Sequence, residues 1–149
     1  PLFPVDRMQW RPGWQPAAPE VVKQQHDQVM RLERWIIDGW GSFDLIEARF
    51  PAADTIIFVD HPLAVHYWWA LKRQFACLFA PRPDGPEGCP MLPMTWPLLK
   101  MIWRIHHQLR PRLLSLVEQQ SGRPGKQVFH ITSPRQLRRF VEQYGRGSS

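Results

Sequence analysis

Aspartates stand directly after short apolar runs, at positions where strands of a parallel sheet would end. They are Asp6, Asp38 and Asp60. Ligands of open parallel sheets bind outside the carboxyl ends of the strands. The sequence therefore predicts carboxylates at the ligand-binding edge of a sheet. Gly39 follows Asp38 and would let the backbone approach a ligand closely.

Basic residues lie on both sides of a proline-rich segment, 80–97, and one of them lies within it. The group consists of Lys72, Arg73, Arg82, Arg110 and Arg112. The planar fork of arginine matches the oxygens of a phosphate group better than the point charge of lysine does. The whole chain carries a formal charge of +6. These features predict a phosphorylated partner, but charge alone does not distinguish a nucleotide from a nucleic-acid backbone.

The elements that would position these residues alternate between strand and helix, which is typical of an α/β domain with a parallel sheet. The predicted strands are 2–5, 35–37, 55–59 and 127–131. The predicted helices are 19–34, 43–49, 62–79, 96–108, a helix from 111, and 134–144. Ser133, Pro134 and Gln136 form a capping box at the start of the last helix. A length of 149 residues with 44% hydrophobic residues predicts one domain.

Other patterns argue against a membrane span and a metal site. Lys72 and Arg73 interrupt the richest apolar stretch, and crossing a bilayer takes about 20 apolar residues. The only cysteines, Cys77 and Cys89, lack the paired spacing of a zinc lid. We expect a cytoplasmic protein without a structural metal.

A set of short motifs, taken in order, resembles the topology-modulation protein family, an adenylate-kinase-like branch of the P-loop nucleotide kinases. The motifs are Asp6 with Trp10-Arg11-Pro12-Gly13-Trp14, Trp35-Ile36-Ile37-Asp38-Gly39, Ala53-Asp54-Thr55-Ile56-Ile57 with Asp60 and Pro62, Lys72-Arg73, Arg82-Pro83-Asp84, Gly88-Cys89-Pro90 and Arg110-Pro111-Arg112. The resemblance covers nearly the whole chain. It implies a three-layer, P-loop NTPase-like parallel sheet flanked by helices.

The phosphate-binding loop of that family, G-x-x-x-x-G-K-[S/T], does not occur in this sequence. Because 2–5 matches the family's second strand, the resemblance implies that the first strand and the P-loop precede Pro1. Residues 1–149 are then expected to be a single adenylate-kinase-like domain without its first strand and loop. Segment 80–97 is expected to be a lid-like loop.

The resemblance implies an ATP-dependent phosphotransferase that uses Mg²⁺ and acts on a nucleotide or a similar small phosphate acceptor. The implied catalytic residues are Asp38, Arg73, Arg110 and Arg112. The implied substrate-binding residues are Asp6, Trp10, Trp14, Gly39 and Arg49, with Lys72 and Arg82 as phosphate ligands of the lid. Trp40, Met91 and Ala70 depart from the family pattern.

Three alternatives remain open at this point. One is a truncated gene product with a packed remnant fold and no catalysis. The positive charge and the family's name are also compatible with a nucleic-acid-associated protein that binds DNA through basic residues, although no helix-turn-helix, zinc finger or RNA-binding signature is present. In addition, Asp6 and Asp38 have an ordinary structural interpretation, because aspartates at strand ends often bond local backbone N–H groups. Large aromatic residues such as Trp10 and Trp14 are likewise more often packing residues than ligand walls.

Overall fold

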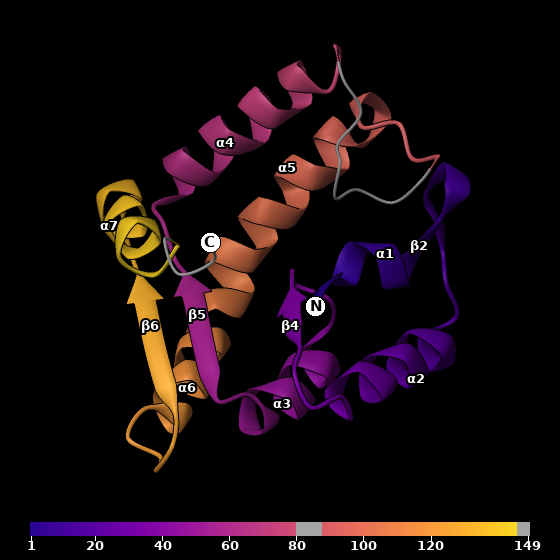
Figure 1. Cartoon of the computed structure of the whole chain (residues 1–149). Coiled ribbons are helices and arrows are strands. Elements are labelled where there is room, and N and C mark those ends of the chain that lie inside the picture. The colour runs from indigo at the N-terminus through magenta and orange to yellow at the C-terminus, as the bar shows by residue number, and fades with distance from the viewer. Residues whose placement is uncertain (80–87, 146–149) are drawn as a thin grey trace. The chain divides into compact units, whose positions relative to one another are not determined.

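The computed structural model describes residues 1–79 and 88–145 (Figure 1). The chain divides into two compact units. Unit 1 comprises Pro1–Ala52 and Arg73–Thr95, and unit 2 comprises Ala53–Lys72 and Trp96–Ser149. The expectation of one adenylate-kinase-like domain stays a prediction.

Unit 1 is built around a pair of parallel strands. β1 (Leu2–Pro4) pairs with β4 (Ile36–Asp38) in the register that sets Pro4 opposite Asp38. Unit 1 also contains the helices α1 (Val5–Gln9), α2 (Pro19–Met30) and α3 (Phe43–Ala52). The first strand is one residue shorter than predicted, because Val5 and Asp6 already belong to the first turn of α1.

The core of unit 1 forms where the apolar face of α2 meets its neighbours. Pro19 stands in the first turn of α2, where a missing N–H costs nothing. Helical spacing then brings Val22, His26 and Val29 to one buried face. The buried cluster consists of Met8, Val22, Val29 and Leu45, with Phe3, Ala17, Trp35 and Ile37 packed against it. This packing holds α2 and α3 beside the β1–β4 pair.

The stretch after α1, predicted to be a loop, forms a small hairpin instead. β2 (Trp10–Arg11) and β3 (Gln15–Pro16) pair antiparallel across a 3₁₀ turn, η1 (Pro12–Trp14). Gly13 in this turn has a φ of 75°, which favours glycine. A second 3₁₀ turn, η2 (Leu92–Met94), lies in the described part of 80–97, and residues 80–87 lie outside the described residues.

Unit 2 contains the second parallel pair, with β5 (Thr55–Val59) and β6 (Gln127–Ile131) side by side (Figure 1). Both strands have the predicted bounds. The helix α7 (Pro134–Tyr144) follows β6, and its Phe140 and Tyr144 rings contact Phe129 with centroids 4.9 and 5.3 Å apart. The predicted capping box is present, since Ser133 accepts a hydrogen bond from the Gln136 backbone.

The connection between β5 and β6 is helical. α4 (Leu63–Ala76) begins in unit 2, and α5 (Thr95–Arg104) continues through a π-helical turn, η3 (Ile105–Leu109), into α6 (Arg110–Gln120). The sequence predicts a break near Pro111. Proline cannot supply the N–H that an α-helix requires, and a π-turn is one way for a helix to continue past such a defect.

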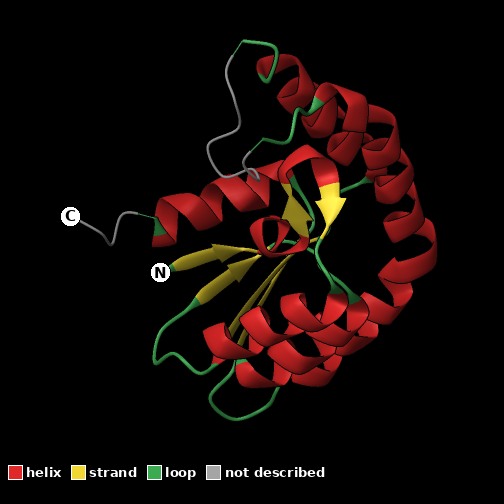
Figure 2. Cartoon of the chain, turned by 90° about the vertical axis from the view of Figure 1, so that its right-hand side faces the viewer, coloured by secondary structure: helices red, strands yellow, loops and turns green. Residues whose placement is uncertain are grey.

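The predicted mixed α/β class is confirmed: most of the described chain is helical and the strands are short (Figure 2). The described strands form two-stranded sheets, β1–β4, β2–β3 and β5–β6, and the predicted single sheet is not seen as one continuous ladder. Among the described residues, no helix combines the length and apolar character needed to cross a bilayer.

Candidate functional site

The carboxyl end of the β1–β4 pair collects several of the predicted site residues. Asp38 is the last residue of β4, and Asp6 lies in the first turn of α1, directly after β1. Parallel pairing sets both strand ends at the same edge of the sheet. Gly39 follows with a φ of 108°, and Gly41 has a φ of 75°. The backbone after Asp38 therefore takes a path that side chains disfavour.

Arg49 connects this edge to α3. Its Nη2 donates hydrogen bonds to the carbonyl oxygens of Gly39 at 2.5 Å and Trp40 at 3.3 Å. The residue is 8% exposed, and its Nη1 is buried without a hydrogen-bond partner among the described residues. Burial lowers the pKa of Arg49, while the charge of Asp38 acts in the opposite direction. A buried cation thus contacts carbonyl oxygens and has spare donors.

His26 lies close enough to Arg49 for the charge of Arg49 to affect its pKa. The sequence analysis did not identify His26 as a site residue. The side chain is fully buried, and both ring nitrogens lack a partner among the described residues. Burial makes the largest contribution to lowering the pKa of His26, and the positive charge of Arg49 lowers it further. The sequence signal was the helical spacing of His26 between Val22 and Val29, which marks the buried face of α2.

The two tryptophans predicted to line the acceptor pocket belong to the hairpin turn. Trp10 and Trp14 meet edge to face, with centroids 5.5 Å apart. Trp14 Nε1 donates to the Pro90 carbonyl oxygen at 2.7 Å, and the Cys89 thiol donates to the Arg11 carbonyl oxygen at 3.3 Å. These contacts tie the turn to the segment beginning at Gly88, and a role in ligand binding stays a prediction.

In unit 2, Asp60 is the centre of a hydrogen-bonded ion network. Its side chain is 4% exposed and accepts bonds from Arg110 Nε to Oδ1 at 2.7 Å and from Arg110 Nη2 to Oδ2 at 2.9 Å. His130 Nε2 lies 2.9 Å from Oδ2. Burial alone would raise the pKa of Asp60, but the bonds from Arg110 and His130 outweigh it and lower the pKa below its ordinary value. The hydrogen bond to Asp60 raises the pKa of Arg110.

Further histidines surround this network. His61 follows Asp60, is 1% exposed, and has no hydrogen-bond partner for either ring nitrogen among the described residues. Its ring contacts those of His66 and Trp69, with centroids 5.8 and 4.9 Å away. Burial lowers the pKa of His66, and the charges of His61 and His106 add to that effect. Within the described ranges, no group of three or more His, Cys, Asp or Glu residues is arranged to hold a metal ion.

The remaining basic candidates are spread over several elements. Arg73 lies in the last turn of α4, in unit 1, and Lys72 precedes it in unit 2. Arg112 lies in the first turn of α6, two residues after Arg110. Arg82 falls outside the described residues. Arg110 is seen in a defined carboxylate pair, so its guanidinium is oriented by Asp60.

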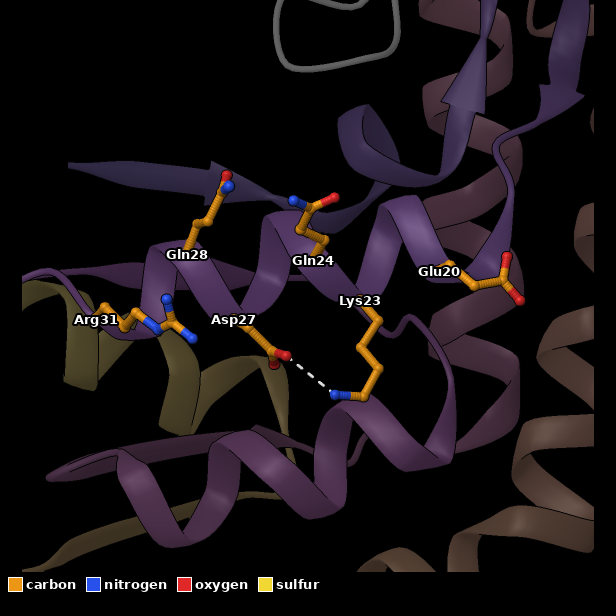
Figure 3. Close-up of a pocket in the computed structure, with 6 residues that line it drawn as sticks. All are labelled: Glu20, Lys23, Gln24, Asp27, Gln28 and Arg31. Atoms are coloured by element: carbon orange, nitrogen blue, oxygen red, sulfur yellow. Dashed lines mark hydrogen bonds and ion pairs between the residues drawn. The ribbon is translucent and has the colours of Figure 1, made fainter.

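A shallow depression on the outer face of α2 encloses about 340 Å³ (Figure 3). Its lining residues are Glu20, Lys23, Gln24, Asp27, Gln28 and Arg31. Lys23 and Asp27 point toward each other and form an ion pair at 3.0 Å. All of these side chains come from one helix, and none belongs to the predicted site.

The lowered pKa values of His26 and His66 predict a stability that falls in mild acid. The folded-state pKa of both His26 and His66 is below the ordinary 6.5, so the unfolded chain binds protons first as pH falls. Their contribution is fully present above about pH 6.5 and is lost progressively below it, toward the folded-state values. The urea midpoint should accordingly drop between pH 7 and pH 5. Replacing the exposed His107 with Gln should leave that drop unchanged. An equal urea midpoint at pH 7 and pH 5 would contradict the lowered pKa values of His26 and His66.

Comparison with known proteins gives no match to this chain: no family model, no curated protein and no solved structure is significantly similar to it. The residues and contacts described above therefore carry the functional argument.

Proposed function

We propose that this chain is part of an ATP-dependent phosphotransferase, similar to nucleotide kinases, that acts on a nucleotide or a similar small acceptor. The supporting observation is the environment of Arg49, a buried guanidinium beside the Asp38–Gly39 strand end. The ordered motifs that resemble adenylate-kinase-like proteins point to the same function. The three-layer P-loop architecture is part of this proposal.

The argument from Arg49 is electrostatic. Removing a charge from water is costly unless the charge is paired and its hydrogen bonds are made. Arg49 has two carbonyl acceptors and the nearby charge of Asp38, but its Nη1 donors have no partner among the described residues. A phosphate group supplies both the missing acceptors and the missing negative charge. Arg49 is therefore suited to bind a nucleotide phosphate, and such binding would require the Gly39–Gly41 loop to expose the buried Nη1.

Of the two cofactors implied by this function, Mg²⁺ fits the residues present and ATP does not. Mg²⁺ commonly keeps several waters and takes one or two carboxylates, and Asp38 offers an exposed carboxylate at the strand end. ATP does not fit the residues present on their own, because the sequence contains no phosphate-binding glycine loop. We therefore assign no reaction step through ATP to a described residue.

The contribution of this chain would be positioning and charge neutralisation. Phosphoryl transfer needs little covalent help from the protein and depends on oriented substrates and compensated charge. Arg49 would bind a phosphate, and Asp38 would orient the water shell of a metal ion. The roles of Asp6, Arg73 and Arg112 stay predictions of the resemblance.

The direct experiment uses the full-length protein, including any sequence upstream of Pro1. It is incubated with ATP and Mg²⁺ and a panel of nucleosides and nucleoside monophosphates, and ADP formation that depends on the acceptor is measured. We expect turnover on at least one acceptor. ADP formation on none of them, in a folded preparation, would contradict the proposed function.

A further inference from the structure

The positive charge of the chain is concentrated in unit 2. That unit holds eleven of the 19 Lys and Arg residues and four of the 13 Asp and Glu residues, so its formal charge is +7 and that of unit 1 is −1. One of the four acids, Asp60, has a side chain that is 4% exposed and is paired with Arg110. Few acids therefore remain to compensate the exposed basic residues of unit 2. Such a charge asymmetry within a chain is typical of proteins that bind a polyanion.

The helix α7 places three arginines of unit 2 on one face. Arg135, Arg138 and Arg139 are three and four residues apart, and this spacing makes side chains neighbours on a helix. All three are exposed, and no ion pair or side-chain hydrogen bond joins them to another described residue. Glu142 shares the face and likewise forms no ion pair with a described residue. These four residues, with a net charge of +2, are called the arginine face of α7.

The opposite face of α7 is apolar and holds the helix in place. The rings of Phe140 and Tyr144 contact the ring of Phe129 in β6, with centroids 4.9 and 5.3 Å apart. The first turn is fixed as well, because the Ser133 side chain accepts a hydrogen bond from the Gln136 backbone N–H. The arginine face is therefore carried by a helix that is anchored at its start and along its apolar side.

We propose that the arginine face of α7 binds the phosphate backbone of a nucleic acid without reading its sequence. This inference goes beyond the proposed phosphotransferase function and does not depend on it. The basic residues of α7 are all arginines, whose planar fork matches the oxygens of a phosphate group. From Arg135 to Arg139 the helix axis rises about 6 Å, and one strand of a duplex presents a phosphate about every 3.4 Å of its axis. Neighbouring phosphates of one strand are thus within reach of the three guanidinium groups.

A nucleic acid suits this face better than a lipid surface does. A helix that lies in a membrane interface buries its apolar face among the lipids. In α7 the rings of Phe140 and Tyr144 on that face are already packed against Phe129. The exposed arginines would contact an anionic partner through charge and hydrogen bonds alone, which is how proteins contact the backbone of a nucleic acid.

The test measures the fluorescence anisotropy of a labelled DNA duplex of mixed sequence with the full-length protein, at several salt concentrations. We expect a dissociation constant of about 10⁻⁶–10⁻⁴ M at physiological salt, with affinity falling as salt rises. In the triple variant Arg135→Gln, Arg138→Gln, Arg139→Gln, the slope of log affinity against log salt should become shallower by about 2–3. Each phosphate contact contributes about 0.9 to that slope. An unchanged urea midpoint of the variant would show that the loss is not caused by unfolding.

A matched control removes the same charge from unit 1. The triple variant Arg11→Gln, Arg31→Gln, Arg34→Gln replaces three exposed arginines of that unit and should keep the slope of wild type. Equal changes of slope in the two triple variants would overturn the proposal, because the effect would then be one of total charge.

Glu142 provides a variant in which binding should improve. Glu142→Gln removes the negative charge from the arginine face and should raise the affinity for the duplex about 3-fold, the size expected for unit charges several ångströms apart in water. Glu33→Gln, at an exposed position of unit 1, should bind as wild type does. An affinity of Glu142→Gln at or below that of wild type would count against the arginine face.

The remaining outcomes identify the partner. Duplex binding that is indifferent to salt, or no duplex binding by folded wild type, would overturn the proposal. Binding to phosphatidylserine vesicles without binding to the duplex would also overturn it, in favour of a membrane surface. None of these measurements uses turnover, so a failure of the phosphotransferase assay and a failure of this inference are distinguishable.

Discussion

Replacing Asp60 with Ala is expected to lower the free energy of unfolding by about 3 kcal/mol, at the low end of the range for breaking a buried ion pair. The carboxylate is 4% exposed and accepts three hydrogen bonds, so its loss deprives Arg110 and His130 of their partner at once. The figure lies at the low end because both partners keep some contact with water. Urea unfolding at pH 7 measures the change.

The control for this prediction is another paired aspartate in a different environment. Asp27 forms an ion pair with Lys23 on the surface of α2, and exposed pairs contribute little to stability. Asp27→Ala should therefore leave the urea midpoint close to that of wild type. Equal effects of Asp60→Ala and Asp27→Ala would show that the Asp60 network is not a stabilising element.

The two parallel strands of unit 2 illustrate what the sequence is able to predict. Thr55–Val59 and Gln127–Ile131 have their predicted bounds because each is a run of β-branched and aromatic residues closed by polar or turn residues. The capping box at Ser133 is equally local, since its donor and acceptor are three residues apart. Such signals depend on neighbouring residues alone.

The contacts that form the Asp60 network join residues that are far apart in the sequence, so no local sequence pattern predicts them. The acid that orients Arg110 lies 50 residues away in the sequence, and His130 lies 70 residues from the same acid. In the sequence, His130 is simply the fourth residue of a strand. Only the register that sets Phe58 opposite His130 brings it to Asp60. The resemblance implies that Arg110 is a catalytic residue, and the structure shows its carboxylate partner, Asp60.

The same limit explains two of the differences in unit 1. Leu2–Val5 has the composition of a strand, yet Val5 begins α1, because one residue at an element boundary is decided by packing and not by propensity. Histidine is a polar residue, so the residue type at position 26 does not indicate burial. Its helical spacing from Val22 and Val29 places it on the face that packs into the core. Tertiary contacts therefore determined both outcomes.

Replacing Arg49 with Met should separate binding from stability. Methionine keeps a long apolar side chain in a buried position and removes a cation whose burial is costly, so the free energy of unfolding should change by less than about 1.5 kcal/mol. Affinity for a nucleotide phosphate should fall about 10–100-fold, because a hydrogen bond to a charged group is worth about 1.5–3 kcal/mol. Calorimetric titration with a nucleoside monophosphate measures this loss in the full-length protein.

Two further variants make the result specific to the guanidinium at this position. Arg49→Lys keeps the charge but loses the forked geometry, so its affinity should lie between those of wild type and Arg49→Met. Arg31→Met removes an exposed arginine from the end of α2 and should bind as wild type does. Arg49 also donates to the Gly39 and Trp40 carbonyl oxygens, which offers a purely structural role. If Arg49→Met unfolds far more readily while its nucleotide affinity is unchanged, Arg49 is a brace for the Gly39–Gly41 loop, and the phosphate site must lie elsewhere.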